Sequence, residues 1–168
     1  EYDSLADMVS FGMAPALVIF QWSLTDMGKF GWMVAFIYAA CGALLLARCN
    51  TQIGTQDKRY FQVLPSPAAA AIIAGWVWAG TSNDFSESMI AIFTIPITFG
   101  AAILMVSSMR YHSFKELDLR NRVPFVVMLV LVLIFALVAI DPPTILFSVF
   151  LIYGLSGPVF TLLKLRQH

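Results

Sequence analysis

Residues 1–20 read EYDSLADMVSFGMAPALVIF, in which two carboxylates lead directly into a long apolar stretch. Asp3 and Asp7 are four residues apart, and this spacing stacks both side chains on one face of a helix. The predicted helix passes from a polar start into lipid, so both acids lie at the edge of the membrane. Because ionisable side chains at that depth are costly, the pair indicates a functional site.

The composition of the chain is typical of a membrane protein. Of the 168 residues, 60% are hydrophobic and 12% are charged, and the mean hydropathy is +0.82. Soluble domains carry about 25% charged residues, so the chain falls outside that class. The formal net charge of zero argues against nucleic acid as a partner, because such binding requires a basic surface.

Six apolar segments predict an all-α fold, a polytopic bundle of transmembrane helices. They cover residues 5–20, 30–47, 67–80, 88–108, 123–140 and 144–163. Each is close to the roughly 20 residues that cross a hydrocarbon core, and helices satisfy their own backbone groups in lipid. No repeat or linker divides the chain, so residues 1–168 are expected to form a single membrane domain. Kinks are expected at the prolines inside spans, which are Pro15, Pro96 and Pro158.

The charges between these segments predict the orientation in the membrane. Lys29 is the single basic residue on one side, and the other nine of the ten lie on the opposite side: Arg48, Lys58, Arg59, Arg110, Lys115, Arg120, Arg122, Lys164 and Arg166. The positive-inside rule makes that second side cytoplasmic, together with Asp3, Asp7 and both chain ends. An aromatic belt at the opposite interface is predicted from the four tryptophans, Trp22, Trp32, Trp76 and Trp78.

The two acids also predict a particular chemistry. Asp3 taken alone could be explained as an acid in the first turn that stabilises the helix dipole. Asp7 lies one turn deeper and should meet a cation. Two carboxylates with no His or Cys nearby favour a hard ion such as Mg²⁺, Mn²⁺ or Ca²⁺. The basic loops 48–59 and 110–122 would hold phosphate or carboxylate charge. Together these features suggest a phosphorylated lipid as substrate.

Several motifs resemble the CDP-alcohol phosphotransferase family, whose signature is D-x2-D-G-x2-A-R-x8-9-G-x3-D-x3-D. Asp3 and Asp7 match its last two aspartates, and residues 3–12 (DSLADMVSFG) are similar to the phosphatidylserine synthase branch. Further similar segments are 47–50 (ARCN), 60–67 (YFQVLPSP) and 110–115 (RYHSFK). The first half of the signature is absent from these residues. The resemblance therefore implies two more helices upstream and predicts that the 168 residues alone are inactive.

The resemblance also implies an activity, in which CDP-diacylglycerol and L-serine give phosphatidylserine and CMP. It makes Asp3 a metal ligand and Asp7 both a metal ligand and the base for the serine hydroxyl, with two divalent ions, Mg²⁺ or Mn²⁺. Candidates for binding substrate are Arg48, Asn50, Arg110, Ser113, Lys115 and Arg120. The active site is expected at the cytoplasmic face of a bacterial-type inner (plasma) membrane, and a homodimer is left open.

Two alternatives remain at this point. The same chemistry could use another acceptor alcohol, namely glycerol 3-phosphate, inositol or choline; a phosphorylated acceptor would favour a denser basic cluster, and choline an aromatic cage. A transporter would instead use Asp3 and Asp7 to line a route through the membrane. Such a route needs polar groups at mid-membrane, and the segments 67–80 and 123–140 contain no ionisable residue.

Overall fold

The computed structural model of the chain describes residues 2–51, 60–61, 64–107, 111–112 and 125–165. Its first arm is a helix of changing type. It consists of α1 (Tyr2–Asp7), the π-helix η1 (Met8–Met13), α2 (Ala14–Ile19), the π-helix η2 (Phe20–Leu24) and the 3₁₀ turn η3 (Thr25–Met27). The irregularity expected around Pro15 is therefore present, as a π-helical segment directly before α2.

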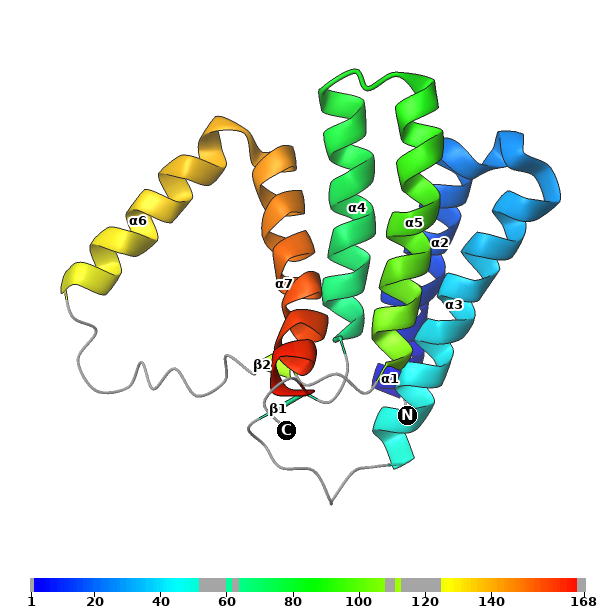
Figure 1. Ribbon diagram of the computed structural model, residues 1–168, viewed down its shortest axis with the longest axis horizontal. Helices are drawn as coiled ribbons and strands as arrows, with labels where there is room; N and C mark the ends of the chain where they lie inside the picture. Colours follow the sequence, from blue (N-terminus) through cyan, green and yellow to red (C-terminus); the bar gives the residue numbers. More distant parts are fainter. Residues whose placement is uncertain (1, 52–59, 62–63, 108–110, 113–124, 166–168) are drawn as a thin grey trace.

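The first arm reverses direction at Gly28, and α3 (Gly28–Thr51) runs back beside it (Figure 1). Gly28 has φ +58° and ψ −128°, a conformation open to glycine but strained for residues with a Cβ. This reversal brings the end of α3 to the same end of the bundle as the start of α1 (Figure 1).

Four more helices complete the described fold: α4 (Ser66–Ser82), α5 (Glu87–Val106), α6 (Phe125–Ile140) and α7 (Pro142–Leu165). The expectation of an all-α fold needs one addition, because β1 (Tyr60–Phe61) and β2 (Tyr111–His112) form a short antiparallel pair. The strands lie at the lower end of the bundle, close to α7 (Figure 1).

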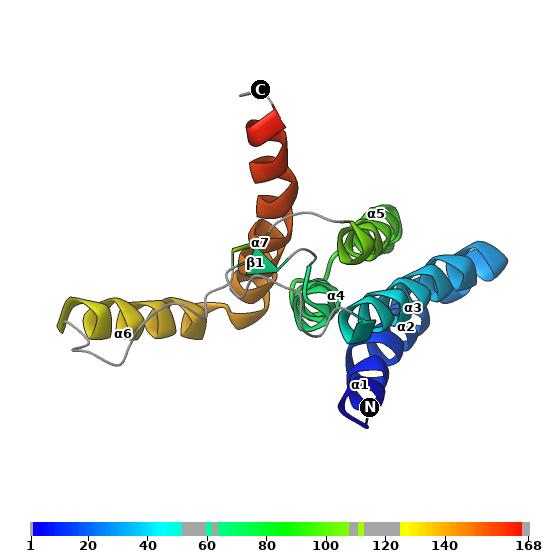
Figure 2. The same ribbon diagram turned by 90° about the horizontal axis from the view of Figure 1, so that it is seen from below.

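The most extensive helix contacts are between α3 and α5 and between α4 and α7. Figure 2 shows α4 near the centre, between α7 and the paired arms α2 and α3. Ala68, Ala69 and Ala70 of α4 are buried, and such small side chains allow neighbouring helices to approach closely. By contrast, α6 contacts α7 and projects away from the other helices in both views (Figures 1 and 2).

Helices occur at all six positions where spans were expected. Within the described residues, three helical stretches are long and apolar enough to cross a membrane: Tyr2–Thr51, Glu87–Val106 and Pro142–Val159. The first of these contains both arms that meet at Gly28. The helices α4 and α6 are not among these three stretches. They have 17 and 16 residues, fewer than the roughly 20 that span a bilayer core. A helical integral membrane protein is thus confirmed, whereas six crossings stay a prediction.

The aromatic-belt prediction is wrong for Trp76, which is only 6% exposed. Its indole Nε1 donates a hydrogen bond of 2.9 Å to Thr94 Oγ1 on α5. An indole with an inward-facing partner is more stable in the helix contact than at the interface. Trp32 and Trp78 are at least half exposed, as an interfacial position requires.

Candidate functional site

Asp3 and Asp7 both belong to α1, at the end of the bundle where α3 also finishes (Figure 1). We call this the acidic end, defined by Asp3, Asp7, Arg48 and Asn50. Asp3 is exposed and Asp7 is partly exposed. One helical turn separates the two carboxylates, as the sequence predicts, so they are on one face of α1. The pair is thus accessible from outside the helix bundle.

The acid-bearing helix widens directly after Asp7. In η1 the backbone N–H of Ala14 donates to Val9 O, five residues earlier, instead of four. Gly12 lies in this widened turn and is buried. The Cβ of an alanine in place of Gly42 on α3 would stand 3.4 Å from Gly12 Cα, so the two backbones nearly touch here. The acids are therefore carried by a helix that is held very close to α3.

A side-chain hydrogen bond ties α1 to the end of α3. Ser4 Oγ donates to Asn50 Oδ1 at 3.1 Å. This bond places Asn50, a predicted substrate ligand, beside Ser4, which directly follows Asp3 in α1. Arg48, the other candidate on this helix, is in the last turn of α3 and is partly buried. The structure thus brings Asp3, Asp7, Arg48 and Asn50 to the same end.

The remaining predicted substrate ligands lie outside the described residues: Arg110, Ser113, Lys115 and Arg120. The short strand pair joins described residues of two of the motifs. Tyr60 pairs with His112 and Phe61 pairs with Tyr111, so two motifs separated by some fifty residues are adjacent at the backbone level. Nearby, Leu64 N–H donates to Leu104 O at 3.4 Å. The helices α3 and α5, which precede these motifs in the sequence, both finish at the end of the bundle that carries the acids (Figure 1).

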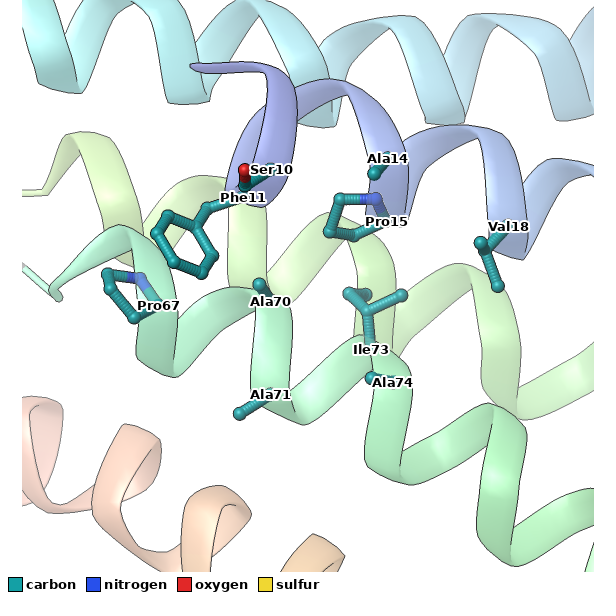
Figure 3. Close-up of a pocket in the computed structure, with 10 residues that line it drawn as sticks. All are labelled: Ser10, Phe11, Ala14, Pro15, Val18, Pro67, Ala70, Ala71, Ile73 and Ala74. Carbon is teal, nitrogen blue, oxygen red and sulfur yellow. The ribbon is translucent and has the colours of Figure 1, made fainter. Parts of the chain in front are cut away.

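An open groove of about 400 Å³ lies between the first arm and α4, and its lining on the first arm starts at Ser10, three residues after Asp7 in the sequence. Figure 3 shows the facing side chains of the two helices. The lining residues are Ser10, Phe11, Ala14, Pro15, Val18, Pro67, Ala70, Ala71, Ile73 and Ala74. All of these except Ser10 have apolar side chains. A hydrocarbon chain is the ligand chemistry that such a surface favours, because burial of apolar area drives its binding.

The two carboxylates can be compared with the requirements of a divalent ion. Among the residues that the structure describes, no group of three or more His, Cys, Asp or Glu side chains could hold a metal. Magnesium commonly takes one or two carboxylates and completes its shell with water and substrate phosphate. Asp3 and Asp7 therefore fit a magnesium-like ion that a phosphate-bearing ligand also contacts, not a closed structural site.

Two supporting residues were not singled out from the sequence. For Ser4 the sequence indicates a candidate helix cap within the acidic motif, and Tyr38 is one tyrosine in an apolar segment. Tyr38 is fully buried, and its hydroxyl donates to Phe11 O at 3.1 Å. Pro15 could have signalled this contact, since a proline leaves the carbonyl four residues earlier without its helical donor.

Several known proteins are similar to the chain. No sequence model of a protein family matches the chain. The CDP-diacylglycerol–serine O-phosphatidyltransferase of Helicobacter pylori is 30% identical over 165 residues, which cover 98% of this chain and 69% of that protein. The archaetidylserine synthase of Methanothermobacter thermautotrophicus is 33% identical over 65% of this chain and 42% of that protein. A Saccharomyces cerevisiae CDP-diacylglycerol–serine O-phosphatidyltransferase is 35% identical over 46% of this chain and 30% of its own length.

A match over nearly the whole chain, together with an acidic pair on the first membrane helix, defines a membrane-embedded phosphatidyltransferase. The chain belongs to the CDP-diacylglycerol–serine O-phosphatidyltransferase family.

Proposed function

We propose that the protein transfers the phosphatidyl group of CDP-diacylglycerol to L-serine, giving phosphatidylserine and CMP. The observation that carries this proposal is the whole-chain similarity to a protein named for that reaction. The name of the archaeal relative also contains serine as the headgroup, although its lipid part differs. Both names favour serine over glycerol 3-phosphate, inositol or choline as the acceptor alcohol.

The acidic end supplies the groups that this reaction needs. The serine hydroxyl oxygen attacks the phosphorus attached to diacylglycerol, a new O–P bond forms, and the phosphoanhydride bond breaks. CMP leaves with the electron pair of that bond, and Asp7 accepts the hydroxyl proton. Divalent ions, two of Mg²⁺ or Mn²⁺, would neutralise the diphosphate when held by Asp3 and Asp7 together with further ligands.

Substrate binding in this proposal uses both polar and apolar surfaces. Arg48, Arg110, Lys115 and Arg120 bind the serine carboxylate and the phosphates, and Asn50 and Ser113 donate hydrogen bonds. The groove beside η1 starts three residues after Asp7 and accepts part of the diacylglycerol. The lipid phosphates would then be held near the carboxylates while the hydrocarbon stays in an apolar environment.

The proposal also includes the arrangement in the membrane. All six helical arms cross the bilayer, and the acidic end faces the cytoplasm of a bacterial-type inner membrane. The support for this orientation is the charge distribution, with nine of ten basic residues on the side of the acidic end. A homodimer is compatible with this topology.

The natural, full-length protein in membranes provides the test. With CDP-diacylglycerol and labelled L-serine we expect labelled phosphatidylserine and equal CMP release, both abolished by EDTA and restored by Mg²⁺ or Mn²⁺. Glycerol 3-phosphate, inositol and choline should give little product at the same concentration. Preferential transfer to one of those acceptors would contradict the choice of serine, and EDTA-resistant turnover would contradict the metal.

Substitution of the acids tests the site within the same assay. Asp7→Asn keeps the size of the side chain but removes its basicity, so CMP release should fall about 10²- to 10⁴-fold. Asp26→Asn is the matched control, because Asp26 is an exposed carboxylate in the turn at the opposite end. That control should keep normal turnover. Near-normal CMP release by the Asp7→Asn variant would remove Asp7 from its proposed role.

A further inference from the structure

The backbone carbonyl of Phe11 lacks the hydrogen-bond donor that a regular α-helix would supply. Its α-helical donor would be the N–H of residue 15, and residue 15 is proline. An unsatisfied carbonyl inside a membrane-embedded helix pair is costly, so another donor is required. The structure supplies that donor from α3, where the Tyr38 hydroxyl lies 3.1 Å from Phe11 O.

The Tyr38 contact is one of several between the acid-bearing arm and α3, and three of them lie close to the acids. Ser4 and Asn50 form the contact nearest the chain start, Gly12 and Gly42 the close backbone approach, and Phe11 and Tyr38 the hydrogen bond between main chain and side chain. Asp7 lies in sequence between the first contact and the other two. Tyr38 is 0% exposed, so its hydroxyl cannot exchange this bond for one to bulk water.

The register of η1 decides where the two carboxylates point. Each residue of an α-helix turns the chain by about 100°, so closing the η1 turn by one residue would rotate the preceding α1 by about that angle. Asp3 and Asp7 would then face away from their present direction relative to Asn50 and Arg48. Whatever holds the wider turn therefore also holds the orientation of the acids.

We propose that Tyr38 is a positioning residue, which fixes the direction of Asp3 and Asp7 by bonding the Phe11 carbonyl, whose α-helical donor Pro15 removes. This inference rests on the proposed phosphatidyl transfer for its kinetic consequences. Its structural part does not depend on that reaction.

Tyr38→Phe in the full-length protein removes one oxygen atom and tests the proposal. We expect kcat for CMP release to fall about tenfold or more while KM for CDP-diacylglycerol changes less than twofold. The Mn²⁺ concentration that half-saturates binding, followed by electron paramagnetic resonance without substrates, should rise severalfold. Amide hydrogen exchange over residues 8–16 should become faster.

Thr94→Val is the matched control, because it also removes a buried hydrogen-bond partner but at the opposite end of the bundle. It should leave kcat and Mn²⁺ binding unchanged. Equal losses of kcat in the two variants, or a kcat of Tyr38→Phe within twofold of wild type, would overturn the proposal. If the wild type transfers no phosphatidyl group to serine, the proposed function fails, and Mn²⁺ binding with hydrogen exchange still decides the role of Tyr38.

A double variant separates positioning from simple stabilisation. Pro15→Ala restores an N–H four residues after Phe11, which can satisfy the carbonyl in the Tyr38→Phe background. We expect the double variant to regain thermal stability but not kcat, because the new bond favours the narrower α-helical turn. Recovery of both stability and kcat would show that Tyr38 only satisfies the carbonyl and would overturn the positioning role.

Discussion

The two ends of the helix bundle are stabilised in different ways. At the end opposite the acids, Trp76 is surrounded by the rings of Trp22, Phe85, Phe93 and Phe147, with centroids 5.5–6.4 Å away. We call this set the aromatic end. Thr94 Oγ1 lies beside it and accepts hydrogen bonds from Trp76 Nε1 at 2.9 Å and from Ser23 Oγ at 3.2 Å.

The acidic end has fewer such contacts among its described residues. Single hydrogen bonds of 3.1 Å join the first arm to α3, at Ser4 and at Tyr38, and Asp3 is exposed. An open groove also lies between the first arm and α4. Sites that bind and release ligands generally belong to the less tightly packed parts of a protein. Under the proposed function, the aromatic end supplies stability and the acidic end supplies the chemistry.

Trp76→Ala should produce the largest loss of stability. The substitution removes a side chain that contacts four aromatic rings and leaves Thr94 without its indole donor. Truncation of a buried tryptophan costs about 3–5 kcal/mol. Unfolding by SDS in mixed micelles measures this loss. Turnover per folded molecule should remain normal, and a selective loss of kcat would contradict the division between the two ends.

Gly31→Ala should produce the next largest effect, at the turn between the first arm and α3. A Cβ at this position would overlap the backbone carbonyl of Leu24, which a side-chain rotation cannot relieve. Overpacking of this kind costs about 1–3 kcal/mol. Gly100→Ala is the control, because a Cβ on Gly100 meets no atom within 4 Å and helix propensity favours alanine. Equal stability of the two variants in the same SDS titration would refute this account.

Thr94→Val should have a smaller effect on stability than Trp76→Ala, in the same range as that of Gly31→Ala. Valine keeps the shape of threonine but cannot accept the hydrogen bonds from Trp76 and Ser23. Leaving a buried indole donor without a partner costs about 1–3 kcal/mol. Thermal unfolding in detergent should show the loss together with a change in tryptophan fluorescence. An unshifted transition would mean that the indole finds another acceptor.

The sequence predicted the position of every described helix, because each apolar segment is long and the loops between segments are polar. It also predicted the acidic pair, since residues four apart share a face of any helix. It did not predict the surroundings of Trp76. A tryptophan near the end of a span suits the membrane interface and the core equally, and the partners Thr94 and Phe147 come from distant parts of the chain.

The close contact between η1 and α3 also could not be predicted from the sequence. Pro15 predicted an irregular helix, but a proline permits a kink, a break or a widened turn. The choice depends on the donor that reaches Phe11 O, and Tyr38 is 27 residues away from it along the chain. The role of Gly12 and Gly42, which is to let the two backbones approach closely, likewise becomes visible only when the two helices are side by side.

The smallest expected effect on stability compares two serines. Ser4→Ala removes the hydroxyl that bonds Asn50 Oδ1 at 3.1 Å, and Ser148→Ala removes one that bonds Thr144 O at 2.7 Å within α7. Each should cost about 0.5–1.5 kcal/mol or less, as single hydrogen bonds do. The Ser4 bond holds α1 beside α3, so its loss should also lower kcat about two- to fivefold. Ser148→Ala should leave kcat unchanged. If both variants keep full kcat, the direction of the acids does not depend on this contact, and the constraint on α1 must come from η1 alone.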